Sequence, residues 1–245
     1  ERRAYADRAE FLGDPDFIYV PQNNLISKEY AVKRFSSFNN KKATPSKNIS
    51  FGNISIDKES EETTHFSVVD KFGNAVSLTT TINGWFGCGI TVDEAGFLLN
   101  NEMDDFSSKP GHPNMYGLVG NEANSIQPNK RMLSSMTPTI IEDSKGELKM
   151  VLGTPGGSTI ITTIAQIIIN YFDFNMSIKE SIENKRFHHQ WLPDKIFIEN
   201  NSLSKETISR LTNMGHNFKY RSSIGEVNLI YIDENQLKHA CSDSR

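Results

Sequence analysis

Cysteine is scarce in this chain. The two thiols, Cys88 and Cys241, are not spaced like metal ligands, and we expect them to be free and buried rather than joined in a disulfide. The adjacent His188 and His189 point apart on either a helix or a strand, so we expect packing rather than a shared zinc site. The sequence also begins at Glu1 with neither an initiating Met nor a signal-like apolar segment, so we expect a fragment or a processed product.

A strong charge of either sign is also lacking. Lys and Arg number 26, Asp and Glu number 30, and the formal net charge of -4 gives no reason to expect nucleic-acid binding. No apolar run approaches the ~18 residues that a membrane-spanning helix needs. What remains, 37% hydrophobic and 23% charged residues, is typical of a soluble globular protein with one or two domains.

The expected elements come in the order strands, helices, strands, which favours a layered α+β fold over βαβ winding. Apolar spacing and capping residues predict helices at 4–13, 27–35, 157–172, 177–187 and 204–215. Alternating or buried apolar runs predict strands at 65–70, 75–83, 136–142, 147–152, 195–199 and, as the last one, 227–233. Residues 36–62 are polar and almost without periodicity, so we expect them to be exposed or mobile.

Thr63 stands where an acidic loop meets the first expected strand, in KESEETTHFSVVD, residues 58–70. A threonine hydroxyl is a poor nucleophile at neutral pH, but the free α-amine of an N-terminal threonine can act as its base. That amine has an ordinary pKa of about 7.7–8.0, so a small shift leaves much of it neutral. An internal threonine has no such amine. Thr63 is therefore either uncovered by cleavage or an ordinary residue at a strand entry.

A glycine pair lies between an expected strand and an expected helix, in TPGGST, residues 154–159. Backbone N–H groups of Gly156 and Gly157 could bind an anion or stabilise an oxyanion at the helix start. The alternative is a tight turn that needs glycine for its backbone angles. A phosphate loop is excluded because the lysine of that motif is missing.

Two polar clusters flank other expected strands. LLNNEMDDFSSKPG places Glu102, Asp104 and Asp105 together, either as a carboxylate pair for an ammonium group or as an Asx-rich turn or cation site. KRMLSSMTP places Ser134 and Ser135 before a strand, where hydroxyl and N–H groups could bind a carboxylate or simply start the strand.

Several segments together resemble bacterial γ-glutamyltranspeptidases, in that family's order and spacing. They are TTHFSVVDKFGNAVSLTTTIN, GFLLNNEMDDFSSKPGHPNMYGLVG, NKRMLSSMTPTI, GTPGGSTIITT and RFHHQWLPD. The upstream AYADRAEFLGDPDF resembles the end of the family's large subunit. The resemblance covers essentially the whole chain and implies an N-terminal nucleophile hydrolase fold, an αββα sandwich, whose precursor cleaves itself before a threonine.

In this sequence the resemblance places that cleavage at the Glu62–Thr63 bond. Residues 1–62 would be the tail of the large subunit with a flexible segment before the cut, and residues 63–245 would be the catalytic small subunit. The rest of the large subunit, absent from this chain, is the implied protein partner. No cofactor and no metal are implied.

The resemblance also assigns a role to each matching residue. Thr63 matches the nucleophile, Thr81 the threonine that supports it, and Gly156 and Gly157 the oxyanion donors. Residues that match the binding site for the substrate's α-amine are Asn83, Glu102 and Asp105. Ser134 and Ser135 match residues around the α-carboxylate, and Tyr116 matches the aromatic residue of a mobile lid.

The implied activity is cleavage of the γ-glutamyl bond of glutathione and related compounds through an acyl-enzyme on Thr63. Water or an amino acid or peptide acceptor would then take the glutamyl group. The alternatives are an inactive, uncleaved fragment that serves as a folded domain, and an acylase or poly-γ-glutamate transferase of the same superfamily. A periplasmic or secreted location is expected from the resemblance alone.

Three features depart from the family pattern or lie beyond this sequence. The family's arginine that pairs with the α-carboxylate lies in the absent part of the large subunit, so we expect this chain alone to bind γ-glutamyl groups poorly. Thr159 stands where many relatives carry Arg, and Cys88 lies in a stretch that is usually free of cysteine.

Overall fold

The computed structural model describes residues 1–50 and 63–245, so Glu62 and the part of the expected mobile segment at 51–62 lie outside the described residues. The described residues form two compact units. The first unit comprises residues 1–50, 102–134 and 189–220, and the second comprises residues 63–101, 135–188 and 221–245. Both units contain residues from 63–245. The predicted division into residues 1–62 and 63–245 is a division by cleavage of the chain, not by compact units, and it stays a prediction.

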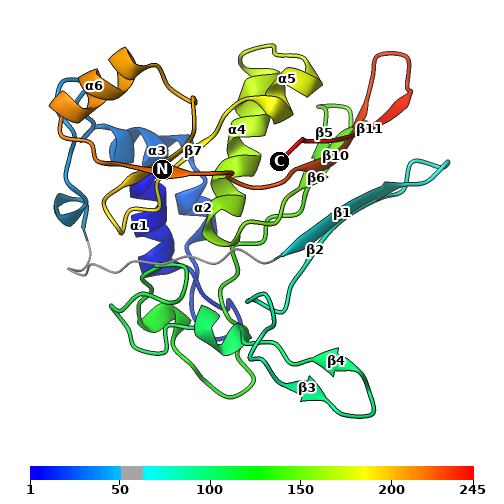
Figure 1. Cartoon of the computed structure of the whole chain (residues 1–245), viewed down its shortest axis with the longest axis horizontal. Coiled ribbons are helices and arrows are strands. Elements are labelled where there is room, and N and C mark those ends of the chain that lie inside the picture. The colour runs from blue at the N-terminus through cyan, green and yellow to red at the C-terminus, as the bar shows by residue number, and fades with distance from the viewer. Residues whose placement is uncertain (51–62) are drawn as a thin grey trace. The chain divides into compact units, whose positions relative to one another are not determined.

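The second unit is built in layers. Its four-stranded antiparallel sheet has the order β11-β10-β6-β5 and is contacted by the separate β1–β2 hairpin (Figure 1). The helices α4 and α5 contact each other, and α4 also contacts β6. These elements are β1 Thr64–Val69, β2 Ala75–Thr80, β5 Thr139–Glu142, β6 Leu148–Gly153, β10 Asn228–Ile232, β11 Lys238–Ser242, α4 Ile160–Phe172 and α5 Ile178–Glu183. The short strands β3 Thr91–Val92, β4 Phe97–Leu98 and β7 Phe187–His188 complete the unit.

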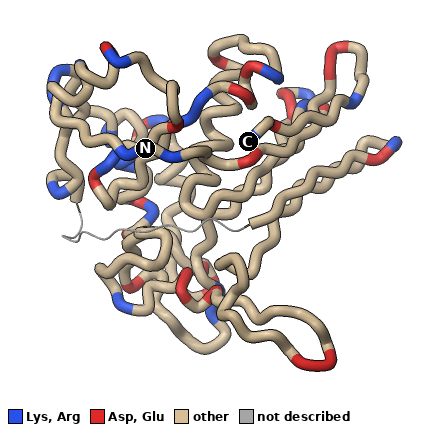
Figure 2. Tube along the Cα trace, viewed as in Figure 1, with Lys and Arg blue, Asp and Glu red and all other residues tan. Residues whose placement is uncertain are grey.

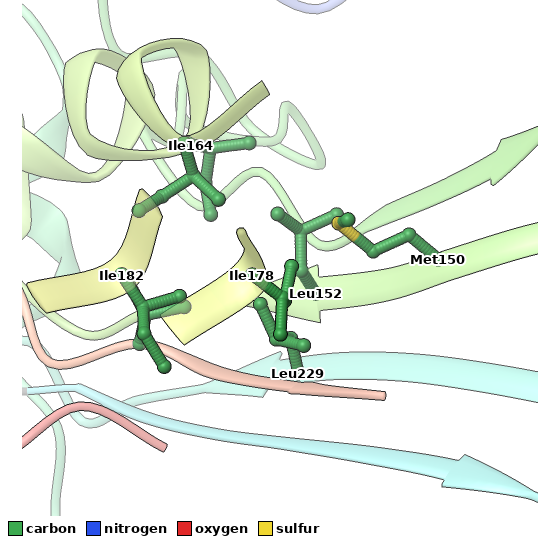
Figure 3. Close-up of a cluster of buried hydrophobic side chains, with 8 residues drawn as sticks. Met150, Leu152, Ile164, Ile178, Ile182 and Leu229 are labelled. Carbon is green, nitrogen blue, oxygen red and sulfur yellow. The ribbon is translucent and has the colours of Figure 1, made fainter. Parts of the chain in front are cut away.

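Alternation along β6 explains how one strand serves two layers, because successive side chains point to opposite faces of a sheet. Met150 and Leu152 belong to a core cluster with Ile164 and Ile167 of α4 (Figure 3). Gly153 lies against the ring of His65 from the hairpin, so it faces the other way. The unit therefore has an α–β–β order, three of the four layers of the predicted sandwich.

The core of the second unit is aliphatic. Met150, Leu152 and Ile167 are fully buried, and α5 adds Ile178 and Ile182 to the same cluster. Each buried side chain of this size contributes roughly 1.5–3 kcal/mol of burial free energy. The β-branched helix α4 is stable in this setting because tertiary packing of its apolar face outweighs its weak intrinsic helix propensity.

The first unit is richer in helices and irregular segments. Its elements are α1 Arg2–Phe11, α2 Gln22–Leu25, α3 Lys28–Phe35, η1 Ser46–Asn48, η2 Glu102–Asp105, η3 Glu122–Asn124, β8 Ile196–Glu199, α6 Lys205–Asn213 and β9 Phe218–Arg221. The expected N-caps are confirmed, since Ser27 accepts a hydrogen bond from the Tyr30 N–H and Ser204 accepts one from the Thr207 N–H.

Four expectations were wrong in part. The helix expected at 177–187 is shorter, because α5 ends at Glu183 and Phe187 belongs to β7. Residues 36–50 are not exposed throughout, because Ala43, Ser46 and Ile49 are buried. The strand at 227–233 is not the last one, since β11 follows it and pairs with β10. Both cysteines are free as expected, but neither is fully buried, since Cys88 is exposed and Cys241 is only partly buried.

Acidic and basic residues are interspersed along the described chain, in agreement with the mild net charge (Figure 2). Among the residues that the structure describes, none of the helices combines the length and the hydropathy that a membrane crossing requires.

Candidate active site

The two candidate threonines lie at one end of the β1–β2 hairpin. Thr64 pairs with Thr80, so the next residues outward, Thr63 and Thr81, sit at the open end of the hairpin, away from its turn. The hydroxyl of Thr81 accepts a hydrogen bond from the Asn83 N–H at 2.9 Å. The register therefore brings the predicted nucleophile and its predicted supporting residue to the same place.

His65 shows which other segment lies near that end. Its ring is buried, with Nδ1 2.8 Å from the Thr79 hydroxyl and Nε2 3.1 Å from the Ser67 hydroxyl, and burial lowers its pKa. The ring packs against Gly153, the last residue of β6, so closely that a side chain at Gly153 has no room. The start of β1 and the end of β6 are therefore adjacent.

The glycine pair follows directly after that end of β6. Gly156 has φ 134° and Gly157 has φ 51°, and both angles favour glycine. The carbonyl of Gly156 accepts hydrogen bonds from the Thr159 N–H at 2.9 Å and from the Thr159 hydroxyl at 2.7 Å. Gly157 then starts η4, Gly157–Thr159, which leads into α4. A fixed turn at the start of a helix is suited to stabilising an oxyanion.

Asn83 is held in a strained but well-bonded position. It is 1% exposed, has φ 72°, and donates its side-chain amide to the Asn101 carbonyl at 3.2 Å. The Asn101 side chain accepts a hydrogen bond from the Gly84 N–H at 2.7 Å. The left-handed backbone at a non-glycine residue is retained here because the surrounding hydrogen bonds determine it, as is common at functional sites.

The candidate amine-binding carboxylates belong to the first unit. Glu102 and Asp105 are the first and last residues of η2. Burial, followed by the neighbouring Glu102 charge, raises the pKa of Asp105 to about 7, while the Arg8 guanidinium opposes this rise. Burial also raises the pKa of Glu102. Both candidate carboxyl groups therefore have raised pKa values, a property typical of functional sites.

The remaining predicted residues are divided between the units. Tyr116 and Ser134 belong to the first unit, whereas Ser135 starts a segment of the second. Tyr116 is 5% exposed, and its carbonyl accepts a hydrogen bond from the Gln190 side chain at 2.8 Å. Its role as the aromatic residue of a lid stays a prediction.

Neither a metal site nor the groove at the hairpin turn belongs to the candidate site in the described residues. Across residues 1–50 and 63–245, no three His, Cys, Asp or Glu side chains gather in a way that could hold a metal ion. A groove of about 530 Å³, lined by residues that include Lys71, Phe72, Glu142 and Lys238, lies at the turn end of the hairpin. It is at the opposite end of β1 from Thr63 and is not part of the candidate site.

Sequence reasoning missed the side chains that hold the candidate substrate-binding segments in place. Asn124 bonds to both the Asp105 and the Leu133 backbone, and Arg131 bonds to Asp14. The residues of these contacts are 9 to 117 positions apart, and no local pattern in the sequence predicts them.

Comparison with known proteins places these features in a family. The family model described as γ-glutamyltranspeptidase matches residues 1–245. The glutathione hydrolase proenzyme of Escherichia coli (strain K12) is 46% identical over 245 residues, which is 100% of this chain and 42% of that protein. The corresponding proenzyme of Pseudomonas aeruginosa is 43% identical over 248 residues, 100% of this chain and 43% of that protein. The chain thus spans less than half the length of these relatives.

Solved structures agree with the sequence comparison. A Helicobacter pylori γ-glutamyltranspeptidase mutant is 48% identical, with a TM-score of 0.70, and the match covers 74% of this chain and 98% of that chain. Cephalosporin acylase from Bacillus halodurans, 20% identical, shares the fold with a TM-score of 0.78 over 99% of this chain and 41% of that one. These matches confirm the α+β, N-terminal nucleophile hydrolase fold. The chain belongs to the γ-glutamyltranspeptidase family.

Proposed function

We propose that this chain is the catalytic part of an enzyme that cleaves the γ-glutamyl amide bond of glutathione and related compounds. The observation that carries the proposal is the convergence of Thr63, Thr81 and the Gly156–Gly157 turn at one end of the second unit. The 46% identity to a glutathione hydrolase proenzyme over the full chain supports the substrate class.

The chemistry begins with a cleavage between Glu62 and Thr63 that frees the Thr63 amine. The amine takes the proton of the Thr63 hydroxyl as its oxygen attacks the γ-carbonyl carbon. Backbone N–H groups of Gly156 and Gly157 stabilise the resulting oxyanion. The carbon–nitrogen bond then breaks, the proton passes to the leaving amine, and the glutamyl group stays on Thr63 as an ester.

The second half of the reaction removes the glutamyl group. Water attacks the ester to release glutamate, or the amine of an amino acid or peptide attacks it to form a new γ-glutamyl amide. Asn83, Glu102 and Asp105 hold the substrate α-amine in this proposal, and Ser134 and Ser135 lie by the α-carboxylate. Tyr116 belongs to the lid over the bound substrate.

The proposal includes a longer protein and an export step. The match to the solved Helicobacter pylori chain covers 98% of that chain and 74% of this one. Residues 63–245 make up about the same share of this chain, which supports a cut before Thr63. The rest of the large subunit supplies the arginine for the α-carboxylate. A periplasmic or extracellular location belongs to the same proposal, and fractionation of cells that express the complete protein tests it.

The test uses the complete precursor with Thr63→Ala, and Thr64→Ala as the matched control. Thr64 is the neighbouring threonine and is exposed on β1. Thr63→Ala is expected to stay a single band on a denaturing gel and to release no nitroaniline from γ-glutamyl-p-nitroanilide. Thr64→Ala is expected to be cleaved and to turn over at close to the wild-type rate. Normal release by the Thr63→Ala precursor would overturn the proposal.

Substrate size is checked with the same wild-type preparation. Poly-γ-glutamate is compared with glutathione at equal bond concentration, and glutathione is expected to be the better substrate. Preference for the polymer would favour the alternative, a poly-γ-glutamate transferase of the same superfamily.

A further inference from the structure

Asn124 is a buried side chain that contacts two of the candidate substrate-binding segments. It is the last residue of η3 and is 5% exposed. Its side-chain amide donates a hydrogen bond to the Asp105 carbonyl at 2.7 Å and accepts one from the Leu133 N–H at 2.9 Å. Its own carbonyl accepts a third bond, from the Ser107 N–H at 2.8 Å.

Asp105 and Leu133, the two partners of the Asn124 side chain, belong to or adjoin the candidate binding residues. Asp105 ends η2, whose last carbonyls have no partner inside so short a helix. Leu133 directly precedes Ser134 in the chain. One amide group thus fixes the backbone on the amine side and on the carboxylate side of the proposed binding site.

The chemistry of these two bonds demands an amide. A backbone carbonyl can only accept and a backbone N–H can only donate, so the orientation of the Asn124 amide is determined. An ionised aspartate has the same shape but offers no donor to the Asp105 carbonyl. Alanine offers neither bond, so both backbone groups lose the partner that the Asn124 side chain supplies.

The short helix η3, which carries Asn124, is also held at its start by a hydrogen bond to α1. Asn121, the residue before η3, donates its side-chain amide to Glu10 of α1 at 2.7 Å. This second asparagine is close in sequence and equally well bonded, yet its bond leads to α1. It therefore provides a control for the stability of the turn alone.

We propose that Asn124 is a positioning residue that sets the spacing between the amine-binding and carboxylate-binding segments of the γ-glutamyl site. This inference rests on the proposed function, because Asp105 and Ser134 have their roles only there. Asn124 contacts neither Thr63 nor Thr81 in its hydrogen bonds, so it acts on substrate affinity rather than on bond breaking.

The first experiment compares Asn124→Ala with Asn121→Ala in the complete, processed protein. Asn124→Ala is expected to raise KM for γ-glutamyl-p-nitroanilide about tenfold or more, since misplacement by about 1 Å is costly, while kcat changes only a few-fold. Self-cleavage is expected to be complete in both variants. Asn121→Ala is expected to lower thermal stability with KM near the wild-type value.

The second experiment uses Asn124→Asp, which keeps the side-chain shape if the alanine variant fails to fold. A protonated aspartate can donate to the Asp105 carbonyl while its other oxygen accepts from Leu133, so it reproduces both bonds of the amide. The KM of Asn124→Asp relative to wild type at the same pH is therefore expected to fall as pH is lowered from 8 to 6. A purely structural role gives no such dependence.

The outcomes separate this inference from the proposed function. Equal KM values for wild type, Asn124→Ala and Asn124→Asp, or equal KM increases for Asn124→Ala and Asn121→Ala, overturn the positioning role while wild-type turnover still supports the function. A wild-type protein that does not release nitroaniline overturns the proposed function itself, and the positioning role with it.

Discussion

Asp14 and Arg131 form a three-point contact inside the first unit. The Asp14 carboxylate accepts hydrogen bonds from the Arg131 backbone N–H at 2.8 Å, from Nε at 3.0 Å and from Nη2 at 2.5 Å. Asp14 is 4% exposed. Because one partner precedes the proposed cut and the other lies shortly before Ser134, this contact would join the two cleavage products without a covalent bond.

The first prediction concerns this contact and pH. The hydrogen bonds from Arg131 hold the pKa of Asp14 well below its ordinary range. A depressed carboxyl pKa adds stability above the unfolded value of about 3.9, and that stability is lost as pH falls below it. Asp14→Asn is therefore expected to lower Tm at pH 6, and the Tm difference from wild type is expected to shrink towards pH 3.

The control for Asp14 is Asp16→Asn. Asp16 also accepts a bond from Arg131 Nη2 at 2.5 Å, but its side chain is 74% exposed, and exposed ion pairs contribute little. Differential scanning calorimetry of the processed protein checks both variants. A Tm loss for Asp16→Asn as large as that for Asp14→Asn would contradict the importance given to burial.

The second prediction concerns Asp105, whose pKa is raised to about 7 mainly by burial and then by Glu102. Only the carboxylate form attracts a substrate ammonium group, so KM for a γ-glutamyl anilide is expected to fall as pH rises from 6 to 8.

The raised pKa of Asp105 also affects the free energy of unfolding, and here a rise in pH is unfavourable. The folded state holds the Asp105 proton more tightly, so Asp105's contribution to the unfolding free energy decreases between about pH 4 and pH 7.

Arg8 provides the variant for this second prediction, because its charge lowers the pKa of Asp105. Arg8→Met is expected to move the KM profile to higher pH. Arg3→Met, on the same helix but bonded to Ser37, is expected to leave the profile in place. Steady-state kinetics from pH 6 to 8.5 provides the measurement, and identical profiles for Arg8→Met and Arg3→Met would exclude the electrostatic role.

Local signals explain which parts of the fold could be predicted. Ser27 and Ser204 are capping residues that act within one helical turn, and they marked α3 and α6 correctly. The β1–β2 hairpin was predictable because its alternation and its turn are contiguous in sequence. β11 was missed because its burial alternates weakly and its pairing with β10 supplies the order.

Long-range contacts explain what the sequence could not predict. Ser46 looks like part of a polar loop, yet its carbonyl accepts a bond from the Trp191 indole at 3.1 Å, and its N–H donates to Asp194 at 2.7 Å. Both partners lie more than 140 residues away. The predicted roles of Thr63, Gly156 and Gly157 come from a family resemblance, whereas the role proposed for Asn124 comes from its hydrogen bonds.

The third prediction concerns the glycine turn. The Thr159 hydroxyl bonds to the Gly156 carbonyl, and Thr159→Val keeps the shape but removes this bond. We expect a lower kcat, by a few-fold to about tenfold, with KM little changed, because a looser turn stabilises the oxyanion less well. Single-turnover release of nitroaniline measures the acylation step directly.

Thr163→Val is the matched control for Thr159. Thr163 is fully buried on the next turn of the same helical segment, and its hydroxyl has no hydrogen-bond partner within the described residues. Its replacement is expected to keep kcat unchanged and to be neutral or slightly stabilising, since it removes a buried polar group without a partner. A drop in kcat for Thr163→Val equal to that for Thr159→Val would show that packing, not the hydrogen bond, matters.

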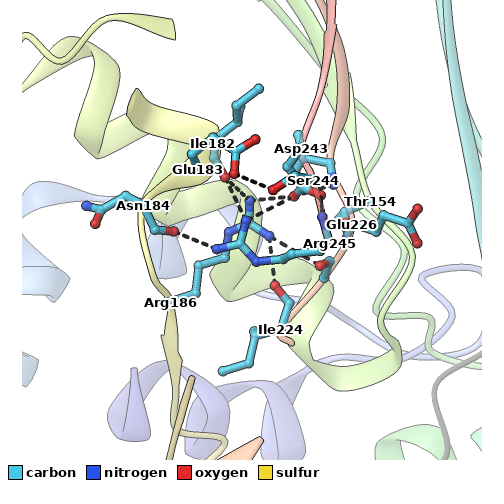
Figure 4. Close-up of polar contacts among 12 residues, drawn as sticks. Thr154, Ile182, Glu183, Asn184, Arg186, Ile224, Glu226, Asp243, Ser244 and Arg245 are labelled. Carbon is cyan, nitrogen blue, oxygen red and sulfur yellow. Dashed lines mark hydrogen bonds and ion pairs between the residues drawn. The ribbon is translucent and has the colours of Figure 1, made fainter. Parts of the chain in front are cut away.

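The fourth prediction concerns the buried pair Arg186 and Asp243, which lie 2.8 Å apart in the second unit (Figure 4). Their side chains are 2% and 0% exposed. Arg186 also donates to the carbonyls of Ile182 at 2.6 Å and Ile224 at 2.8 Å, and Asp243 accepts from the Val227 N–H at 2.9 Å. The pair therefore ties the C-terminal residues to α5 and to the segment beside Gly225, which lies against Gly156.

Removing one partner leaves the other charge buried, so Asp243→Leu is expected to lower the unfolding free energy by about 3–5 kcal/mol. Replacing both partners by apolar residues is often harmless for a buried ion pair. Here the double variant Arg186→Met with Asp243→Leu is expected to stay destabilised, because the Ile224 carbonyl loses the Arg186 donor and the Val227 N–H loses the Asp243 acceptor. Urea unfolding of the single and double variants measures the difference, with Lys149→Met at the half-exposed Lys149–Asp143 pair as the control. Recovery of wild-type stability in the double variant would contradict this expectation. It would show that the hydrogen bonds from the pair to these backbone groups contribute little to stability.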